Sequence, residues 1–176
     1  MVGVGAVGSR VVKKAEALGM RVLRNDPPLA RKTGDPRYLP LDAALAGADY
    51  VTLHVPLTQA GEDATADLAG AGFFARMKKG AAFLNTSRGG VAVEEDLLDA
   101  LDAGRASAAV LDVWREEPWI RPATVDRAFL ATPHIAGFSF DGKAAATAVL
   151  HEALCARFGA RPSWPGQRDP LTHAEN

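Results

Sequence analysis

Gly3-Val4-Gly5-Ala6-Val7-Gly8, close to the start of this 176-residue chain, is the stretch that decides its fold. The spacing is that of a G-x-G-x-x-G turn between a β-strand and an α-helix. The first glycine permits the tight turn, the second lets backbone approach a pyrophosphate, and the third lets the helix pack on the strand. The N–H groups at the start of the helix then face the phosphates. The motif predicts a dinucleotide site, although alone it is weak evidence.

The residues that follow the glycine turn continue the same pattern. The amphipathic run 9–18 predicts a helix, and Gly19 ends it as a C-cap. Residues 20–23 predict the next strand. Strands usually have about 5–6 residues. Here the expected first strand consists of residues 1–4 only. We therefore expect a truncated first strand that leaves unpaired backbone in the sheet, lowers stability and favours aggregation.

Asp26 comes directly after the expected strand 20–23, where a carboxylate binds the ribose hydroxyls of NAD. The alternative role is that of a turn residue before two prolines. A carboxylate here also repels the additional phosphate of NADP. Arg24 and Arg31 lie nearby, so NADP stays open as an alternative.

Strand and helix patterns alternate along the rest of the chain. The expected strands are apolar over their whole length, which is typical of parallel strands buried on both faces. We predict an α/β fold of the Rossmann-like, doubly wound type, a parallel sheet with helices on both faces. The expected strands are 50–55, 81–85, 108–112 and 129–132, and the expected helices are 41–48, 68–77, 94–103 and 142–158.

Composition narrows the class of protein and its partners. Apolar residues make up 48% of the chain and the net charge is −1, which disfavours broad binding to nucleic acid or to an anionic membrane. The sequence shows no apolar run of transmembrane length and no signal-peptide pattern. The single cysteine, Cys155, cannot form an internal disulfide. A cytoplasmic protein is expected.

Chemically capable residues follow the expected strands. Ligands of doubly wound sheets bind at the carboxyl ends of the strands, and His54, Arg88, Asp112 and His134 each end or follow one. Arg88, on a glycine-flanked turn, can offer a planar fork to a carboxylate, although a surface ion pair is the alternative. These positions predict one site along the sheet edge.

Glu117 and His134 are modest signals separately. A Glu-Glu-Pro stretch is usually a solvated loop, and a lone histidine is more often structural than catalytic. Together with Arg88 they supply a carboxylate binder, a histidine and a carboxylate to orient it.

These stretches resemble the signatures of the D-isomer-specific 2-hydroxyacid dehydrogenase family. The matching stretches occur in the family's order, and the resemblance covers residues 1 to about 158. They are 3–8, 54–58, 85–89, 111–118 and 132–137.

The resemblance implies an NAD-dependent dehydrogenase acting on CH–OH, with no metal. His134 would take the hydroxyl proton of the substrate, Glu117 would hold the imidazole, and Arg88 would bind the substrate carboxylate. Phe138 would also face the substrate. The residues expected at the NAD site are Gly3, Gly5, Ala6, Val7, Gly8, Asp26, His54, Thr86, Ser87, Arg88, Asp112 and Gly137.

A narrower resemblance, to the erythronate-4-phosphate dehydrogenases of vitamin B6 (pyridoxine) biosynthesis, is carried by 25–28, 113–114 and 134–143. Two positions depart from that pattern: Phe138 stands where tyrosine is frequent, and Asp67 where histidine is frequent. The alternatives are another member, acting on glycerate, phosphoglycerate or hydroxypyruvate, and a non-catalytic NAD-sensing module.

The resemblance also sets expectations for domain organisation. Residues 1–158 would be the NAD-binding domain, and the Pro/Gly-rich residues 159–176 a disordered tail. The family's N-terminal substrate domain and the subfamily's C-terminal dimerisation region would be absent. The intact enzyme would be a homodimer acting on a small 2-hydroxy acid, possibly phosphorylated, and the chain alone is expected to have little activity.

Overall fold

The computed structural model of the chain describes residues 1–164, in two compact units, 1–134 and 135 onward. The elements of the first unit, in chain order, are α1 (Gly8–Ala17), α2 (Pro27–Thr33), α3 (Leu41–Gly47), β1 (Tyr50–Leu53), α4 (Ala71–Arg76), β2 (Ala81–Asn85), the 3-10 turn η1 (Gly89–Val91), α5 (Glu94–Asp102), β3 (Ala106–Leu111), α6 (Pro122–Arg127) and β4 (Leu130–Ala131). The fold is α/β, as predicted.

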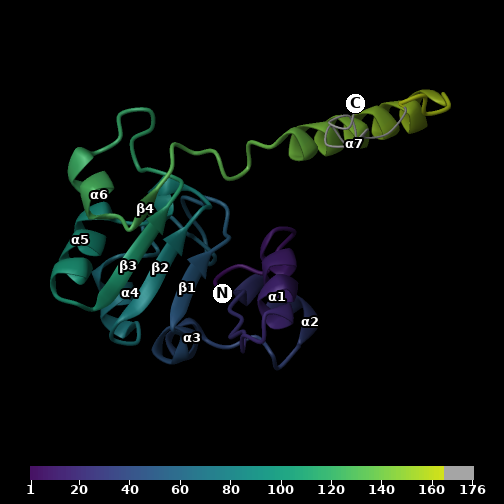
Figure 1. The fold of residues 1–176 in the computed structure, drawn as a ribbon. Helices are drawn as coiled ribbons and strands as arrows, with labels where there is room; N and C mark the ends of the chain where they lie inside the picture. The colour runs from purple at the N-terminus through teal and green to yellow at the C-terminus, as the bar shows by residue number, and fades with distance from the viewer. Residues whose placement is uncertain (165–176) are drawn as a thin grey trace. The chain divides into compact units, whose positions relative to one another are not determined.

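The four strands form a parallel sheet in the order β1-β2-β3-β4. Figure 1 shows α1 and α2 together beyond the β1 side of this sheet, and α5 and α6 toward its β3–β4 side. Parallel strands place all their carboxyl ends at one edge, so the loops after β2, β3 and β4 gather there.

The N-terminal residues extend the sheet beyond β1. The Val2 N–H donates to the Thr52 carbonyl (2.9 Å), and the His54 N–H donates to the Val2 carbonyl (2.7 Å). On the opposite side, the Asn25 N–H donates to the Met1 carbonyl (2.9 Å). The chain therefore runs from a central segment to one neighbour and then to the other. This reversal is the topological switch point at which doubly wound folds bind ligands.

Residues 20–23 do not form the predicted strand. Pairing occurs instead at Arg24 and Asn25, through isolated bridges to Tyr38 and Val2. Of the predicted strand, Leu23 contacts the N-terminal segment through its carbonyl, which accepts from the Met1 amino group (3.0 Å).

The helix α2, which begins with two prolines, was not predicted; a turn at Asp26 before these prolines was only the alternative role of that residue. The Asp26 side chain accepts a hydrogen bond from the Leu29 N–H (3.0 Å) and caps the helix. Proline suits the first helical position, where its missing N–H has no partner to lose and its φ is already helical. The unpredicted helix α6 likewise begins at Pro122.

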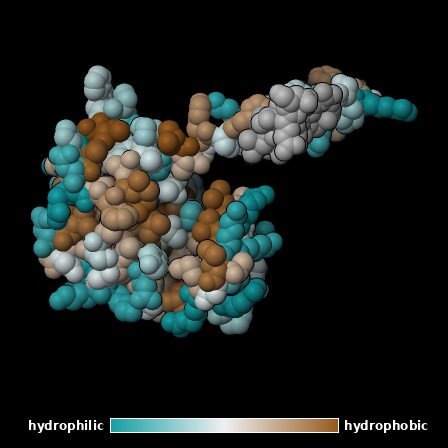
Figure 2. All heavy atoms as spheres, in the orientation of Figure 1, coloured by the Kyte–Doolittle hydropathy of each residue, from teal (hydrophilic) through white to brown (hydrophobic). Residues whose placement is uncertain are grey.

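The core lies between the sheet and helices α3 to α5. Phe73 and Phe74 of α4 and Phe83 of β2 are almost fully buried, with edge-to-face ring centroids 5.2–6.1 Å apart. Such contacts add to the stabilisation from burying apolar area. Figure 2 shows apolar residues on the visible face of the first unit interspersed with hydrophilic ones.

The second unit contains α7 (Phe140–Phe158). The Ser139 hydroxyl accepts from the Gly142 N–H (3.0 Å) and caps the start, while Gly159, in the left-handed conformation, ends the helix. No helix within residues 1–164 is long and apolar enough to cross a membrane. Of the expected disordered tail, 165–176 lie outside the described residues. The domain boundary at 158 stays a prediction.

The buried amino group of Met1 makes stability depend on pH. Burial lowers its pKa from 8.0 to about 6. Below pH 6 both the folded and unfolded states are protonated and the desolvation cost is complete, whereas above pH 8 both are neutral and the cost is gone. Folding should therefore become more favourable by about 2–3 kcal/mol as pH rises from 6 to 8. Urea unfolding at both pH values measures this gain, and an N-terminally acetylated chain should lose most of it; an equal gain after acetylation would contradict the assignment.

Candidate active site at the strand ends

The three glycines of the opening motif have different surroundings. Gly3 has φ +85°, and a Cβ there would lie 2.5 Å from the His54 carbonyl oxygen. A Cβ on Gly8 would lie 2.2 Å from the Gly3 carbonyl oxygen, so the start of α1 packs directly on the turn. A Cβ on Gly5 would meet nothing within 4 Å. The turn therefore leaves open space at the glycine whose backbone is expected to approach a pyrophosphate, and the chain fits a dinucleotide there.

Asp26 connects the glycine turn to α2. Its Oδ2 accepts from the Val4 N–H (2.8 Å) and its Oδ1 from the Leu29 N–H (3.0 Å). A carboxylate has about four acceptor positions, so two remain for ribose hydroxyls. The predicted ribose role stays a prediction, with a geometry that allows it.

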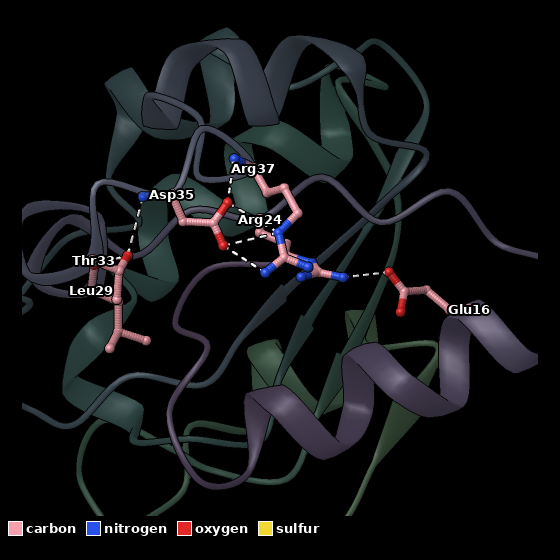
Figure 3. Close-up of polar contacts among 6 residues, drawn as sticks. All are labelled: Glu16, Arg24, Leu29, Thr33, Asp35 and Arg37. Atoms are coloured by element: carbon pink, nitrogen blue, oxygen red, sulfur yellow. Dashed lines mark hydrogen bonds and ion pairs between the residues drawn. The ribbon is translucent and has the colours of Figure 1, made fainter.

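Both arginines that left NADP open are engaged with carboxylates. The Arg24 guanidinium lies 2.5 Å from the Glu16 carboxylate of α1, as Figure 3 shows, and Arg31 forms an ion pair with Asp63. An additional phosphate near Asp26 would therefore compete with existing partners for either guanidinium. These pairs favour NAD over NADP.

His54 follows β1 and lies beside the glycine turn. Its Nε2 is 3.0 Å from the Thr52 hydroxyl. Burial and the nearby amino group of Met1 lower the pKa of His54, so the imidazole is neutral at pH 7. The expected contact of His54 with NAD stays a prediction.

The turn after β2 is shaped by Asn85, which sequence reasoning missed. The buried Asn85 side chain accepts from the Ser87 N–H (3.1 Å) and hydroxyl (2.8 Å) and donates to the Arg88 carbonyl (3.0 Å). Ser87 is buried, whereas Thr86 and Arg88 are exposed. The sequence did offer a signal for this role, because Asn85 is an amide residue at the end of an otherwise apolar strand.

Arg88 lies on this turn with its Nη1 donating to the Ser87 carbonyl (2.6 Å). The following residue, Gly89, contacts the neighbouring loop so closely that a Cβ would lie 1.8 Å from the Trp114 carbonyl oxygen. The Arg88 turn is thereby held against the loop that carries Glu117. Within the described part of the chain, no hydrogen bond or ion pair joins Arg88 to Glu117 or His134.

Glu117 and His134 are brought together as predicted. The Glu117 Oε2 lies 2.6 Å from the His134 Nδ1, and the Glu117 Oε1 accepts from the Trp114 N–H (2.8 Å). Partial burial raises the pKa of Glu117, but the hydrogen bonds from His134 and Trp114 outweigh it and hold that pKa below its usual value. The ionised carboxylate fixes the imidazole, whose side chain is 45% exposed, with Nε2 left for another partner.

Trp114 and Thr132 support the pair from behind and were also missed. The Trp114 indole N–H donates to the Thr132 carbonyl (3.0 Å), and the Thr132 hydroxyl donates to Asp112 (2.6 Å). His134 follows two residues later with φ +55°, a left-handed conformation that is uncommon for a residue other than glycine. Because a buried indole N–H needs a hydrogen-bond partner, the tryptophan at position 114 was the signal in the sequence for such a contact.

Gly137 and Phe138 belong to the second unit. Phe138 is 68% exposed, and the Lys143 ammonium lies 3.3 Å from the centroid of its ring. The roles predicted for both residues, like those of Ala6 and Val7 in the glycine turn, stay predictions.

Comparison with known proteins shows to which family the chain is similar. The sequence model for "D-isomer specific 2-hydroxyacid dehydrogenase, NAD binding domain" matches residues 1–136. An erythronate-4-phosphate dehydrogenase of Salinibacter ruber is 49% identical over 171 residues, which are 94% of this chain and 43% of that protein. One from Bacteroides fragilis is 45% identical over 158 residues, covering 90% of this chain and 45% of that protein. The chain thus spans about half the length of the curated relatives it matches.

A solved structure gives the same result at the level of the fold. The D-lactate dehydrogenase of Lactobacillus jensenii, determined with NAD⁺, matches with a TM-score of 0.72 and 26% identity over 95% of this chain and 54% of that chain. This agreement confirms the predicted Rossmann-type NAD-binding fold.

Proposed function

The chain belongs to the D-isomer specific 2-hydroxyacid dehydrogenase family, and we propose that it is the NAD-binding part of an erythronate-4-phosphate dehydrogenase. Two observations support this: the identity of 45–49% to enzymes of that name, and the hydrogen bond between Glu117 and His134 at the strand ends. The second carries the proposal, because it supplies an acid–base pair at the carboxyl ends of β3 and β4.

In this proposal each residue has a separate role. Bound NAD supplies the hydride acceptor for the substrate C2. His134 takes the hydroxyl proton at Nε2, because its Nδ1 is engaged with Glu117. The ionised Glu117 stabilises the imidazolium that results. Arg88 binds the substrate carboxylate through its planar fork. Loss of the hydride from C2 and of the hydroxyl proton converts the substrate into a 2-keto acid.

The proposal extends to the whole enzyme. We infer a substrate of the 4-phosphoerythronate type, a place in pyridoxine biosynthesis, a homodimer and a cytoplasmic location. Another 2-hydroxyacid substrate within the family is the nearest alternative. A non-catalytic NAD sensor is less favoured, since a sensor has no need for Arg88, Glu117 and His134 together.

The chain by itself should bind NAD and turn over little substrate. Family enzymes of this kind close a second domain over the substrate to exclude water, and the chain spans about half of such a protein. Calorimetry with NAD and a spectrophotometric assay with 4-phosphoerythronate measure the two properties separately. Heat of NAD binding without turnover is expected. Robust oxidation by the 176-residue chain, or no detectable NAD binding, would contradict the proposal.

Replacing Asp26 with asparagine should weaken the preference for NAD over NADP. An amide oxygen can still cap α2, while the charge that repels the additional phosphate is removed. We expect the ratio of NADP to NAD dissociation constants to fall by about tenfold, which corresponds to about 1.4 kcal/mol. Asp99→Asn, on α5, is a matched control that should leave the ratio unchanged. An unchanged ratio in Asp26→Asn would remove Asp26 from the ribose site.

A further inference from the structure

Glu94, the first residue of α5, has a buried carboxyl side chain that the proposed reaction does not use. Its Oε1 accepts from the backbone N–H of Arg115 (3.0 Å), and its Oε2 accepts from the hydroxyl of Thr124 (2.7 Å). The side chain therefore joins the start of α5 to the loop after β3 and to α6. A polar group is costly to bury unless it is hydrogen-bonded, and here both oxygens have partners.

The N–H that Glu94 binds is next in the chain to the N–H that Glu117 binds. The Trp114 N–H donates to the Glu117 Oε1 (2.8 Å), and the following N–H, that of Arg115, donates to Glu94. Two glutamate side chains thus hold consecutive N–H groups of one loop. The place of the Glu117 carboxylate depends on the Trp114 N–H, and the peptide group that follows is fixed by Glu94.

The carbonyl of that peptide group packs closely on the turn that carries Arg88. A Cβ on Gly89 would lie 1.8 Å from the Trp114 carbonyl oxygen and 2.6 Å from the Arg115 nitrogen. The close approach to Gly89 limits where the carbonyl can lie, and the hydrogen bond to Glu94 sets the direction of the N–H. The peptide group 114–115 is therefore fixed at both of its polar atoms.

The Arg115 side chain adds a second contact to the same loop. Its Nη1 donates to the Ala92 carbonyl (3.3 Å) and forms an ion pair with Asp67. The side chains of Arg115 and Asp67 are 39% and 53% exposed, and exposed ion pairs contribute little. Loss of Glu94 would instead leave the N–H of Arg115 and the buried hydroxyl of Thr124 without their acceptor, which is the larger penalty.

We propose that Glu94 is a positioning residue for the Glu117–His134 pair, acting through the N–H of Arg115. Glu94 has no described contact with His134, so it acts only by fixing the loop from which Glu117 reaches the imidazole. The importance of this role for turnover rests on the proposed function, in which His134 is the base.

The tautomer of His134 reports whether Glu117 is in place. An ionised carboxylate can only accept a hydrogen bond, so the His134 Nδ1 that contacts Glu117 carries the proton. In the neutral ring Nε2 is then unprotonated and can accept the proton of a substrate hydroxyl. If Glu117 moves away, this preference is lost and the ring becomes a mixture of the two tautomers.

The test measures the ring ¹⁵N chemical shifts of His134 in the 176-residue chain, at a pH where the ring is neutral. Wild type should show the Nδ1–H tautomer, and Glu94→Ala a mixture of both. Glu94→Gln should keep the wild-type tautomer, because its amide oxygen can accept from Arg115 while its NH₂ donates to the Thr124 hydroxyl. An unchanged tautomer in Glu94→Ala, or an equal change in Glu94→Gln, would overturn the proposal.

Two further variants separate positioning from stability. Ala100→Gly, on the same helix, should lower Tm because glycine weakens a helix, yet it touches no hydrogen bond of Glu94 and should leave the His134 tautomer unchanged. A change as large as that in Glu94→Ala would overturn the proposal. Glu94→Asp replaces Glu94→Ala if alanine unfolds the chain: one methylene shorter, it should weaken the bond to Arg115 and give part of the tautomer change, and no change would count against positioning.

Turnover is measured separately in the intact enzyme. A positioned base contributes about 10²–10⁴-fold, and Glu94→Ala misplaces the base without removing it, so kcat should fall by roughly tenfold. Glu94→Gln should restore kcat to near the wild-type value. The chemical shifts require no turnover, so a mixed tautomer with unchanged kcat would support the positioning role and contradict His134 as the base. A loss of kcat with an unchanged tautomer would overturn the positioning role.

Discussion

The intact enzyme carrying His134→Ala is expected to lose about 10²–10⁴-fold in kcat while binding NAD as before. The imidazole is held through Nδ1 by a carboxylate whose pKa is below its usual value, which leaves Nε2 for the proposed role of proton acceptor. Alanine removes that acceptor without touching the glycine turn. Stopped-flow and steady-state assays of the intact enzyme give kcat, and calorimetry gives the dissociation constant for NAD.

Two glutamate variants control for indirect effects on the loop. Glu117→Gln keeps the size of the side chain and its hydrogen bond to the Trp114 N–H but removes the charge, so we expect a smaller loss of kcat than in His134→Ala. Glu116→Gln, on the same loop but without a described contact to His134, should retain activity. Turnover at the wild-type rate in His134→Ala would exclude the histidine as the base.

The parallel topology explains why the candidate site could be predicted from sequence. Once apolar strands were recognised, Arg88, Glu117 and His134 had to follow neighbouring strands at one edge. The contact between Glu117 and His134 then agreed with prediction because it joins the loops after two adjacent strands, β3 and β4. A topology of this kind depends on the pattern of apolar residues, which the amino-acid sequence alone shows.

The supporting hydrogen bonds could not be predicted in the same way. Asn85, Trp114 and Thr132 act through distances and angles that depend on how two loops pack, and Gly89 matters because of an approach to Trp114 that no local pattern reveals. The strand predicted at 20–23 failed for a related reason. Its residues have strand propensity, but a strand also depends on a hydrogen-bonded neighbour, and the pairing occurs at Arg24 and Asn25 instead.

The second large expected effect comes from replacing glycines of the opening turn. Alanine at two of these positions should separate the loss of cofactor binding from the loss of folding stability. Gly5→Ala adds a Cβ into open space, so the Tm should stay within a degree or two of wild type, while the methyl group blocks the approach of a pyrophosphate. We expect NAD affinity to fall by at least about tenfold, or 1.4 kcal/mol. Differential scanning fluorimetry with and without NAD reads both quantities in one experiment.

Gly8→Ala is the matched opposite, because its Cβ would lie 2.2 Å from the Gly3 carbonyl oxygen and backbone must move to admit it. A clash of this kind between α1 and the turn should cost roughly 1–3 kcal/mol of overpacking strain and lower Tm clearly, with NAD affinity lost as a consequence. If the turn were only structural, Gly5→Ala would be silent in both measurements. If it cradles a pyrophosphate, Gly5→Ala loses NAD with the fold intact, and only Gly8→Ala loses both.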